Sequence, residues 1–590
     1  MILRKALVGT AVHECSMTVH NADISALFNR MADLLEIEGA NPFRIRAYRR
    51  AAATIDDLPE NIATMIAEGR ILSDLPGIGD DLAAKIEEFA MTGHLKALEE
   101  VEARTPSTLA LLTSIPGLGP KRVHQLHMAL GVQTLEDLAK AAKEGKIRHL
   151  PRFSVEAEAK ILQEIAQFRE RNQRFKISTA EDFAHGLTAY LKAGPGIVRV
   201  VAAGSFRRRR ETVGDLDILV TSENGFKAIE YFLAYDGIAR VLAKGPSRST
   251  VTLKAGIQVD IRVVPEISYG AALHYFTGSK THNIAVRKLA QAMGLKLNEY
   301  GVFKGSRRIA GRTEEEIFSS VGLPFIEPEL REDRGEIEAA RQGRLPILVS
   351  VSDIRGDLHA HTKASDGKNT LAEMADAATM LGYEYLAISD HSRHATVAHG
   401  LDSKRLSAQL DEIDRLNDQH GTESCRLLKS CEVDILEDGK LDLPDSMLKR
   451  LDVTVCGVHF RFDLGIEEQT RRIIHAMDNR HFHILAHPTG RLLGDRPGYA
   501  VDLDRVIETA KTHGCFLEVN AHPSRLDLDD LHCRQTRNVG VKLAISTDAH
   551  STLGLSAMRH GVDQARRGWV EAADVLNTRP WNDLKKMLAR

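Results

Sequence analysis

The chain after residue 345 carries nine histidine and acidic side chains whose types and spacing are those of metal ligands. They are His359, His361, Asp366, His391, Glu432, His459, His487, Asp548 and His550. In the His-x-His and Asp-x-His pairs, alternate residues of a strand point to the same face, so both side chains of a pair can approach one ion. Mixed imidazole and carboxylate ligands suit Zn²⁺, Mn²⁺ or Fe²⁺ rather than Mg²⁺ alone. The residues therefore predict a metal-binding site.

Three aspartates earlier in the chain predict a second metal site of a different kind. Asp215 and Asp217 alternate along a short apolar run, so their side chains project to one side of a strand. Asp260 lies in another strand-like run and can complete the cluster. Three carboxylates suit Mg²⁺ or Mn²⁺ in a two-metal transfer of a phosphoryl group. We therefore expect nucleotidyl transfer at this site.

A Gly-Ser turn followed by arginines precedes these aspartates. Gly204 and Ser205 follow a strand-like run, and Arg208 belongs to a run of four arginines. Such a turn lets backbone N–H groups approach a phosphate, so we expect Ser205 and Arg208 to hold a triphosphate. An Asp-x-Asp pair alone is more often a solvated strand end, and the arginine run alone could be a solvated loop. The turn at this spacing favours the nucleotide site.

Two glycine-rich turns are repeated near the N-terminus. They are Leu75-Pro-Gly77-Ile-Gly79 and Ile115-Pro-Gly117-Leu-Gly119, each followed by a helical pattern, with Lys121 just after the second. A third copy, Leu150-Pro-Arg-Phe-Ser154, has lost its glycines. Helix-hairpin-helix turns of this kind bind the nucleic-acid backbone through N–H groups without reading sequence. One copy alone is equally well a plain turn between helices, but two copies favour DNA binding.

The segment after the second carboxylate run carries a family resemblance. Tyr275-Phe-Thr-Gly-Ser279, followed by Asn283 and Arg287, together with the Gly-Ser turn and the three aspartates, resembles the family X DNA polymerases. The resemblance implies that Tyr275 and Phe276 lie beside the nucleotide sugar. It also implies that Gly204, Gly278 and Asn283 contact the nucleotide and that Arg287 faces the template.

The N-terminal helices are similar to the small lyase domain of the polymerase beta type. The similarity covers Asn41-Pro-Phe-Arg44-Ile-Arg-Ala-Tyr48 and the first hairpin through Phe89. It implies that Lys85 forms a Schiff base with a 5′-deoxyribose phosphate, and that Arg44 and Tyr48 contact phosphate. Asp81 stands where that family has a second lysine, and the alternative is that Lys85 is a surface lysine near the DNA backbone.

The histidine-rich region resembles the PHP (polymerase and histidinol phosphatase) domain over roughly residues 350–575, with every ligand position of that domain present. The resemblance implies a distorted barrel of seven parallel strands with helices between them. It also implies up to three metal ions that hydrolyse phosphoesters. A family X core followed by PHP is the arrangement of bacterial and archaeal family X polymerases, so the resemblance covers the chain from about residue 17. Met17 is accordingly expected to be the natural start.

The elements that must position these residues change along the chain. Apolar residues at three- and four-residue spacing predict helices over residues 17–176, short β-branched runs predict strands over 196–265, and βα alternation predicts a parallel barrel after residue 350. The expected domains are a lyase-like helical domain (17–100), helix-hairpin-helix fingers (101–176), an α+β nucleotidyltransferase palm (177–264), a thumb (265–330), a linker (331–350) and the PHP domain (351–575).

Composition is that of an ordinary globular protein, with 43% hydrophobic residues and a net charge of -3 from 78 basic and 81 acidic side chains. No overall positive charge points to nucleic acid, so any such site must be local. No apolar run approaches the roughly 20 residues of a membrane span, and a monomeric cytoplasmic protein is expected. The six cysteines include no Cys-x-x-Cys pair and are expected to be reduced.

The motifs, together with the resemblance to family X polymerases with a PHP domain, imply a DNA polymerase that fills short gaps in base excision repair. Its partners would be gapped or primed DNA and deoxynucleoside triphosphates, and its C-terminal domain would be a 3′→5′ exonuclease, with abasic-site endonuclease action as a further option. One alternative keeps the polymerase but makes the C-terminal domain a small-molecule phosphoesterase. Another makes the front half a DNA-binding scaffold with an inactive polymerase site.

Overall fold

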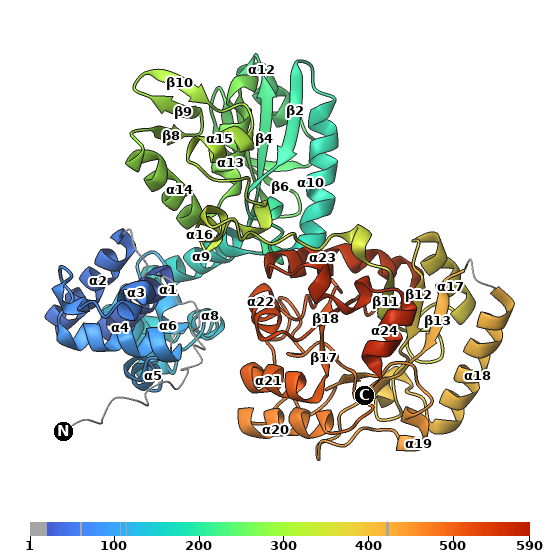
Figure 1. Ribbon diagram of the computed structural model, residues 1–590. Coiled ribbons are helices and arrows are strands. Elements are labelled where there is room, and N and C mark those ends of the chain that lie inside the picture. The colour runs from blue at the N-terminus through green and yellow to red at the C-terminus, as the bar shows by residue number, and fades with distance from the viewer. Residues whose placement is uncertain (1–20, 59–61, 107, 114, 421–423, 590) are drawn as a thin grey trace, which may run out of the picture. The chain divides into compact units, whose positions relative to one another are not determined.

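A computed structural model describes residues 21–58, 62–106, 108–113, 115–420 and 424–589 (Figure 1). The chain forms two compact units, and the boundary between them lies after Gln173. Cys15 and Met17 lie outside the described residues.

The first unit is helical. Its core is built from apolar residues at helical spacing, such as Phe28, Met31 and Leu35, which are buried on one face of the first helix. The helices are α1 (Asn21–Ile37), α2 (Pro42–Asp57), α3 (Ile62–Ala67), α4 (Asp80–Thr92), α5 (Lys96–Glu102), α6 (Thr108–Leu112), α7 (Pro120–Leu130), α8 (Leu135–Lys143) and α9 (Val155–Asn172).

Three hairpins in this unit share one backbone conformation. Gly77 and Gly117 have φ values of 80° and 89°, and Arg152 in the third copy has a φ of 69°. A non-glycine residue with this left-handed φ is uncommon. Ser154 begins α9 by accepting a hydrogen bond from the Ala157 N–H at 3.1 Å. The third hairpin therefore keeps the turn although its glycines are gone.

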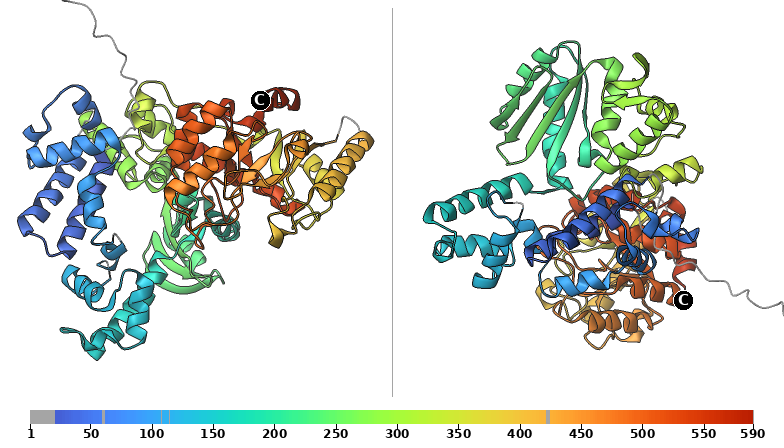
Figure 2. Two further views of the ribbon diagram at one scale, coloured as in Figure 1. Left: turned by 90° about the horizontal axis from the view of Figure 1, so that it is seen from below. Right: turned by 90° about the vertical axis from the view of Figure 1, so that its left-hand side faces the viewer.

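The second unit begins with a five-stranded sheet in the order β2-β4-β7-β6-β5, in which β4 and β7 are parallel and the other pairs antiparallel (Figures 1 and 2). Helix α10 runs beside this sheet in Figure 1. The elements are β1 (Phe175–Lys176), α10 (Ile177–Lys192), β2 (Ile197–Ala202), α11 (Gly204–Arg207), β3 (Thr212–Val213), β4 (Asp215–Ser222), α12 (Gly225–Leu233), β5 (Ile238–Lys244), β6 (Arg248–Leu253) and β7 (Gln258–Val264).

Helices and a small antiparallel sheet follow. They are α13 (Tyr269–Thr277), α14 (Lys280–Ala292), β8 (Lys296–Asn298), β9 (Gly301–Lys304), β10 (Arg307–Ala310), α15 (Glu314–Ser320) and α16 (Glu336–Arg341). Residues 331–350, for which we expect a linker, contain α16 and bury Arg331, Glu336 and Val349. Trp569, from the C-terminal part, packs into the same core as α14 and α15.

The C-terminal part contains parallel strands with helices outside them (Figure 1). The strands are β11 (Gly356–Ala360), β12 (Tyr385–Ile388), β13 (Arg426–Lys429), β14 (Glu432–Asp434), β15 (Val455–Gly457), β16 (Ile484–Leu485), β17 (Phe516–Asn520) and β18 (Leu543–Ser546). The helices are α17 (Leu371–Met380), α18 (Ser403–His420), α19 (Asp445–Leu448), α20 (Ile466–Met477), α21 (Leu503–His513), α22 (Asp530–Val539), α23 (Met558–Arg567) and α24 (Trp581–Leu588).

These strands are arranged in two sheets, β11-β12-β13 and β14-β15-β16-β17-β18. The bridge between His391 and Glu432 links the sheets on one side, and the bridge between Ala360 and Ala549 links them on the other. Among the described residues the ladders therefore approach a ring without forming one continuous closed sheet.

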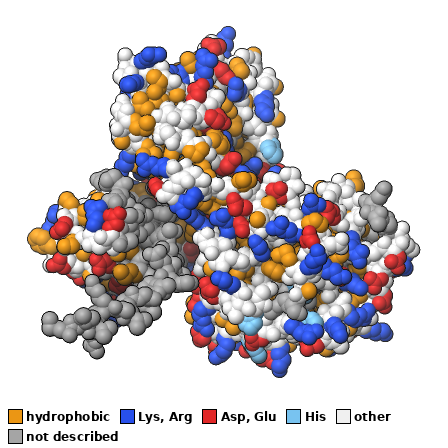
Figure 3. Space-filling model, in the orientation of Figure 1, with side chains coloured by type: hydrophobic (Ala, Val, Ile, Leu, Met, Phe, Trp, Pro, Cys, Tyr) orange, Lys and Arg blue, Asp and Glu red, His pale blue; other side chains and the backbone are white. Residues whose placement is uncertain are grey.

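No helix in the part of the chain that is described combines the length and apolar character needed to cross a bilayer. Lys and Arg side chains are interspersed with Asp and Glu on the visible face of the second unit (Figure 3). Among the described residues, the cysteines are buried and form no disulfide bond: Cys425, Cys431, Cys456, Cys515 and Cys533.

Candidate active sites

The three aspartates of the middle region lie on one face of the sheet. Asp217 on β4 is the register partner of Asp260 on β7, and Asp215 is two residues earlier on β4. Asp260 accepts hydrogen bonds from the hydroxyl of Thr250 and, at 2.7 Å, from Nε2 of Gln258. The parallel pairing of β4 with β7 thus places all three carboxylates together.

Mutual repulsion changes the titration of this cluster. Burial, followed by the charges of Asp215 and Asp260, raises the pKa of Asp217 to about 7. Burial, followed by Asp260, also raises the pKa of Asp215. Like charges held together in a partly desolvated site disfavour ionisation unless a cation compensates them. The donor set therefore fits hard divalent cations.

The Gly-Ser turn lies directly against these carboxylates. Gly204 has a φ of 61°, and a Cβ at this position would lie 2.1 Å from Oδ2 of Asp217. The N–H of Ala203 donates to the Asp217 carbonyl at 2.7 Å. Ser205 is half-buried in the first turn of α11. Only glycine fits between the turn and Asp217, so the turn and the carboxylates form one site.

Arg208 follows the turn and is largely buried. Its Nε donates to Glu332 at 3.0 Å, and its Nη1 donates to the carbonyl of Thr277 at 2.8 Å. Thr277 ends α13, which carries Tyr275 and Phe276. Arg208 therefore joins the Gly-Ser turn to the segment expected to contact the nucleotide.

The segment between α13 and α14 is held by one asparagine. Nδ2 of Asn283 donates to the carbonyls of Tyr275 at 2.7 Å and Gly278 at 3.1 Å, while Oδ1 of Asn283 is buried without a hydrogen-bond partner. A Cβ at Gly278 would lie 2.4 Å from that Oδ1. The rings of Tyr275 and Phe276 pack edge to face at 5.1 Å. Arg287 is half-exposed one turn further along α14.

In the first unit, Lys85 lies on α4 with its Nζ 2.5 Å from Oδ2 of Asp81. Burial lowers the pKa of Lys85, but the interactions with Asp81 and Tyr48 together outweigh it, so the pKa is raised. Tyr48 is buried, and Nζ of Lys85 lies over its ring, 5.7 Å from the ring centre. Arg44 and Lys121 are exposed. The amine is therefore held in its protonated form.

The two intact hairpins of that unit each start a helix. Gly79 is the residue before α4, and Gly119 is the residue before α7. A Cβ at Gly77 would lie 2.9 Å from Cδ of Arg50, whereas the space around Gly117 is open.

The C-terminal ligand candidates converge on Glu432. This carboxylate is buried and lies 2.9–3.5 Å from ring nitrogens of five histidines: His359, His361, His391, His459 and His487. Burial raises the pKa of Glu432, but His459 and His391 outweigh it and hold the pKa well below its usual range. The sequence places these residues up to 128 positions apart, and the strand ends bring them together.

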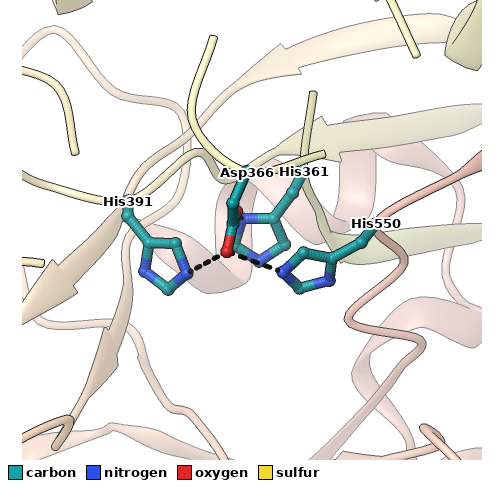
Figure 4. Close-up of side chains that lie close together, drawn as sticks. All are labelled: His361, Asp366, His391 and His550. Carbon is teal, nitrogen blue, oxygen red and sulfur yellow. Dashed lines mark ion pairs between the residues drawn. The ribbon is translucent and has the colours of Figure 1, made fainter. Parts of the chain in front are cut away.

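Three groups of ligand atoms around this centre are close enough to hold ions. They are His361, Asp366, His391 and His550; His359, His361 and Asp548; and His391, Glu432 and His459. Figure 4 shows the first group, in which Asp366 lies between His391 at 3.7 Å and His550 at 3.3 Å. Nε2 of His487 donates to Oε1 of Glu432 at 2.9 Å, and His487 belongs to none of these three groups among the described residues.

Opposite charges pair within this centre. Burial lowers the pKa of His459, but Glu432 and Asp434 outweigh it and raise the pKa to about 10. Burial raises the pKa of Asp366, but His550 and His361 outweigh it and lower the pKa to about 2. Burial is the main cause that lowers the pKa of His391 to about 4. The histidines and carboxylates therefore partly neutralise one another.

Two carboxylates that the sequence analysis does not predict complete this centre. Asp434 lies 2.7 Å from Nδ1 of His459, and Glu518 lies 2.8 Å from Nδ1 of His359. Both orient an imidazole by its second nitrogen, as carboxylates beside metal-bound histidines do. Asp434 follows Glu432 by two residues on one strand, and that alternation is the pattern that could have revealed it.

Comparison with known proteins adds three family matches. Residues 19–95 match a helix-hairpin-helix domain, and residues 109–167 match a SAM-like helix-hairpin-helix tandem. Residues 272–332 match the DNA polymerase beta thumb.

A relative of nearly the same length decides the family. The DNA polymerase/3′-5′ exonuclease PolX of Bacillus subtilis (strain 168) is 37% identical over 576 residues, which are 97% of this chain and 100% of the relative. The chain belongs to the family X DNA polymerases. The DNA polymerase lambda of Arabidopsis thaliana is 27% identical over 53% of this chain and 62% of its own length. A probable phosphatase of Thermoanaerobacter sp. (strain X514) is 29% identical over 38% of this chain and 89% of its own length.

Divalent metal ions fit both sites of this family X polymerase. The three middle carboxylates offer hard oxygen donors that repel one another when empty of cations. In the C-terminal centre, Nδ1 of His361 is buried and has no hydrogen-bond partner among the described residues. A buried polar atom without a partner is costly, and a metal ion would satisfy its lone pair.

Proposed function

We propose that this family X polymerase copies a DNA template to fill short gaps in base excision repair and removes 3′ nucleotides with its C-terminal region. The observation that carries the proposal is the packing of Gly204 against Asp217, beside the register pair of Asp217 with Asp260. Gapped or primed DNA and deoxynucleoside triphosphates are the proposed substrates, and the proposed state is a cytoplasmic monomer.

In the polymerase site, Asp215, Asp217 and Asp260 would hold Mg²⁺ or Mn²⁺. These ions supply activation of the primer hydroxyl and neutralisation of the leaving pyrophosphate. Gly204 leaves room for the phosphate-binding turn, in which Ser205 and Arg208 would contact the triphosphate. The carboxylates would thus hold the metal ions and the turn would hold the triphosphate, because the turn lies directly against Asp217.

The segment after α13 would position the incoming nucleotide. Tyr275 and Phe276 would lie beside its sugar, and Gly278 and Asn283 would shape the floor beneath it. The two hydrogen bonds from Asn283 to backbone carbonyls support this role, because they fix the turn between the helices. Arg287 would face the template strand.

In the first unit, the hairpin backbones at Gly77, Gly79, Gly117 and Gly119 would bind DNA phosphates, with Arg44 and Lys121 adding charge. Lys85 would form the Schiff base with a 5′-deoxyribose phosphate, and the alternative is a phosphate contact, which the ion pair of Lys85 with Asp81 favours because a nucleophilic amine must lose its proton. Tyr48, which is buried, would support this surface through packing against Phe28.

The C-terminal region would be a PHP domain over about residues 351–575, holding up to three Mn²⁺, Zn²⁺ or Fe²⁺ ions. Only Ser430 and Cys431 separate β13 from β14, so these two strands count as one in a distorted seven-stranded barrel. The metal ions supply a water of lowered pKa for phosphoester hydrolysis. Asp434 and Glu518 would orient His459 and His359 toward them.

The remaining proposed boundaries are 17–100 for the lyase-like domain, 101–176 for the fingers, 177–264 for the palm and 265–330 for the thumb. The thumb match to residues 272–332 supports the last of these. Residues 331–350 would act as a structured connection, because they bury ionic side chains against the thumb.

The test is a primer-extension assay on a one-nucleotide gap with Mg²⁺ or Mn²⁺, run beside a 3′-end-labelled primer without nucleotides. The proposal predicts single-nucleotide incorporation in the first reaction and release of labelled mononucleotide in the second. Absence of incorporation would favour a DNA-binding scaffold with an inactive polymerase site.

A second candidate for the C-terminal region is a phosphatase acting on small phosphate monoesters. The similarity of this region to a probable phosphatase favours it. The two candidates differ in substrate, so hydrolysis of a phosphate monoester at a rate that exceeds attack on the labelled 3′ end would support the second.

A further inference from the structure

A network of buried ionic side chains connects Arg208 to helix α23 in the C-terminal region. Arg567, the last residue of α23, donates from Nη1 to the carbonyl of Arg208 at 2.7 Å and to Oε1 of Glu332 at 3.1 Å. The same Oε1 accepts from Nε of Arg208 at 3.0 Å. The exposed fractions of the three side chains are 11% for Arg208, 8% for Glu332 and 3% for Arg567.

Glu332 competes for the positive charge of Arg208. Although burial raises the pKa of Glu332, Arg208 and Arg567 outweigh it and lower the pKa to about 2. Glu332 is therefore an anion, and Arg210 is a more distant partner at 3.6 Å. Without Arg567, this buried carboxylate would keep only Arg208 at 3.0 Å and Arg210 at 3.6 Å as cationic partners.

Arg567 also contacts Asp530, at 2.5 Å from its Nη2. Asp530 has a second partner, because Nη1 of Arg334 donates to it at 2.8 Å. Loss of Arg567 would therefore leave Asp530 with Arg334, and Glu332 would lose one of its three arginine partners and depend more on Arg208.

We propose that Arg567 is a positioning residue for nucleotide binding: it shares the negative charge of Glu332 and holds the Arg208 carbonyl, so that Glu332 competes less with the triphosphate for the Arg208 guanidinium. The inference rests on the proposed function, in which Arg208 contacts the triphosphate. An undercompensated carboxylate beside that site would repel the phosphates and hold Arg208 more tightly, since charges interact strongly in a partly desolvated site. A helix of the hydrolytic region thereby serves the polymerase site.

The neighbouring Arg566 provides a matched control. It lies on the same helix and is also largely buried, with its Nε 2.8 Å from Glu329 and its Nη1 3.1 Å from the Val349 carbonyl. Its substitution removes a buried arginine of α23 without touching the network of Glu332 and Arg208.

The experiment measures KM for the nucleotide and kcat on a one-nucleotide gap with the full chain. Arg567→Gln is expected to raise KM about tenfold, the order expected for one charge-assisted hydrogen bond, with kcat within about threefold. Arg566→Gln should raise KM less than about twofold. Glu332→Gln in the Arg567→Gln background should return KM to within about threefold of the parent value, because it restores the local charge balance.

Two results would overturn the inference: no greater effect of Arg567→Gln than of Arg566→Gln, or a double variant no better than Arg567→Gln alone. A merely structural role gives the second result, because removing Glu332 would not repair lost packing. If Arg567→Gln fails to fold, the single variant Glu332→Gln provides the test. An unchanged or lower KM for the nucleotide in Glu332→Gln supports the inference. A KM raised more than about threefold in that variant contradicts it.

Arg208→Ala separates this inference from the proposed function. An unchanged KM in Arg208→Ala would remove the triphosphate contact on which both depend. A raised KM in Arg208→Ala with an unchanged KM in Arg567→Gln would leave the proposed function intact and overturn only the role of Arg567.

Discussion

The two proposed metal sites of the second unit differ in how the charges of their candidate ligands are compensated. In the polymerase site, three carboxylates face one another and the pKa of Asp217 rises to about 7. In the C-terminal centre, carboxylates alternate with imidazoles, and the pKa of Glu432 falls well below its usual range. The first site needs cations before it can be fully ionised, whereas the second is largely compensated by its own histidines.

This difference suits two uses of metal ions. A site of carboxylates alone binds hard ions that arrive together with a nucleoside triphosphate, whose charge they share. A site of imidazoles and carboxylates holds softer ions more permanently and keeps them between substrates. We therefore expect the first site to respond strongly to the metal in solution and the second to retain its metal through purification.

The largest expected effect is on hydrolysis. Glu432→Ala removes the carboxylate around which five imidazoles gather, and should lower 3′→5′ hydrolysis on the order of 10³-fold, since metal-bound groups contribute several kcal/mol to catalysis. Incorporation on a one-nucleotide gap, measured with the same preparation, should change less than about twofold. Equal loss of both activities in a folded variant would mean that the sites are not independent.

The second effect concerns the fit of the Gly-Ser turn against Asp217. Gly204→Ala places a Cβ 2.1 Å from Oδ2 of Asp217 and should lower incorporation about 10²-fold, because displacing one positioned group typically costs that much. Gly305→Ala is the control: Gly305 has the same φ of 61°, but nothing lies within 4 Å of the added Cβ. Similar losses in both variants would assign the effect to backbone strain instead of the contact.

The third expected effect concerns Glu518, one of the two carboxylates that the sequence does not predict. Glu518→Gln weakens the hydrogen bond to Nδ1 of His359 and should lower hydrolysis about tenfold to 100-fold through weaker metal retention. The check is metal content per chain together with the hydrolysis rate. A lowered rate with full metal content would place Glu518 in another role.

The smallest effect is the pH dependence of metal binding at the polymerase site. The pKa of Asp217 is raised, so the protonated form persists up to about pH 7 and must lose its proton before an ion binds. Mg²⁺ affinity should therefore rise as pH increases, by up to about tenfold per unit below pH 7, and level off above it. Isothermal titration of the full chain between pH 5.5 and 8.5 measures this slope, and a flat profile would contradict the charge comparison.

The alternation of residues along single strands could be read from the sequence. The pairing of strands that are far apart in the sequence could not. The alternation of Asp215 and Asp217 follows from strand geometry, but the pairing of Asp217 with Asp260 depends on how β4 and β7 align. Likewise, repeated His-x-His spacing marks ligands, whereas the single carboxylate of Glu518 in an apolar strand carries no pattern of its own.

Residues 331–350 are a second case in which the sequence pattern does not predict the observed structure. It has little apolar periodicity, which predicts a linker. In the structure, buried ionic pairs order it instead, including Glu336 with His282 at 2.6 Å and Arg331 with Glu314. Hydrophobic periodicity does not reveal order that depends on distant charged partners.

The most direct test of two independent metal sites uses one substrate for both activities. A gapped DNA labelled at the primer 3′ end is incubated with Asp217→Ala and, separately, with His361→Ala, each with and without nucleotides. Two independent sites predict that Asp217→Ala still shortens the primer without extending it, and that His361→Ala still extends it without shortening it. Loss of both activities in either folded variant would contradict the existence of two sites.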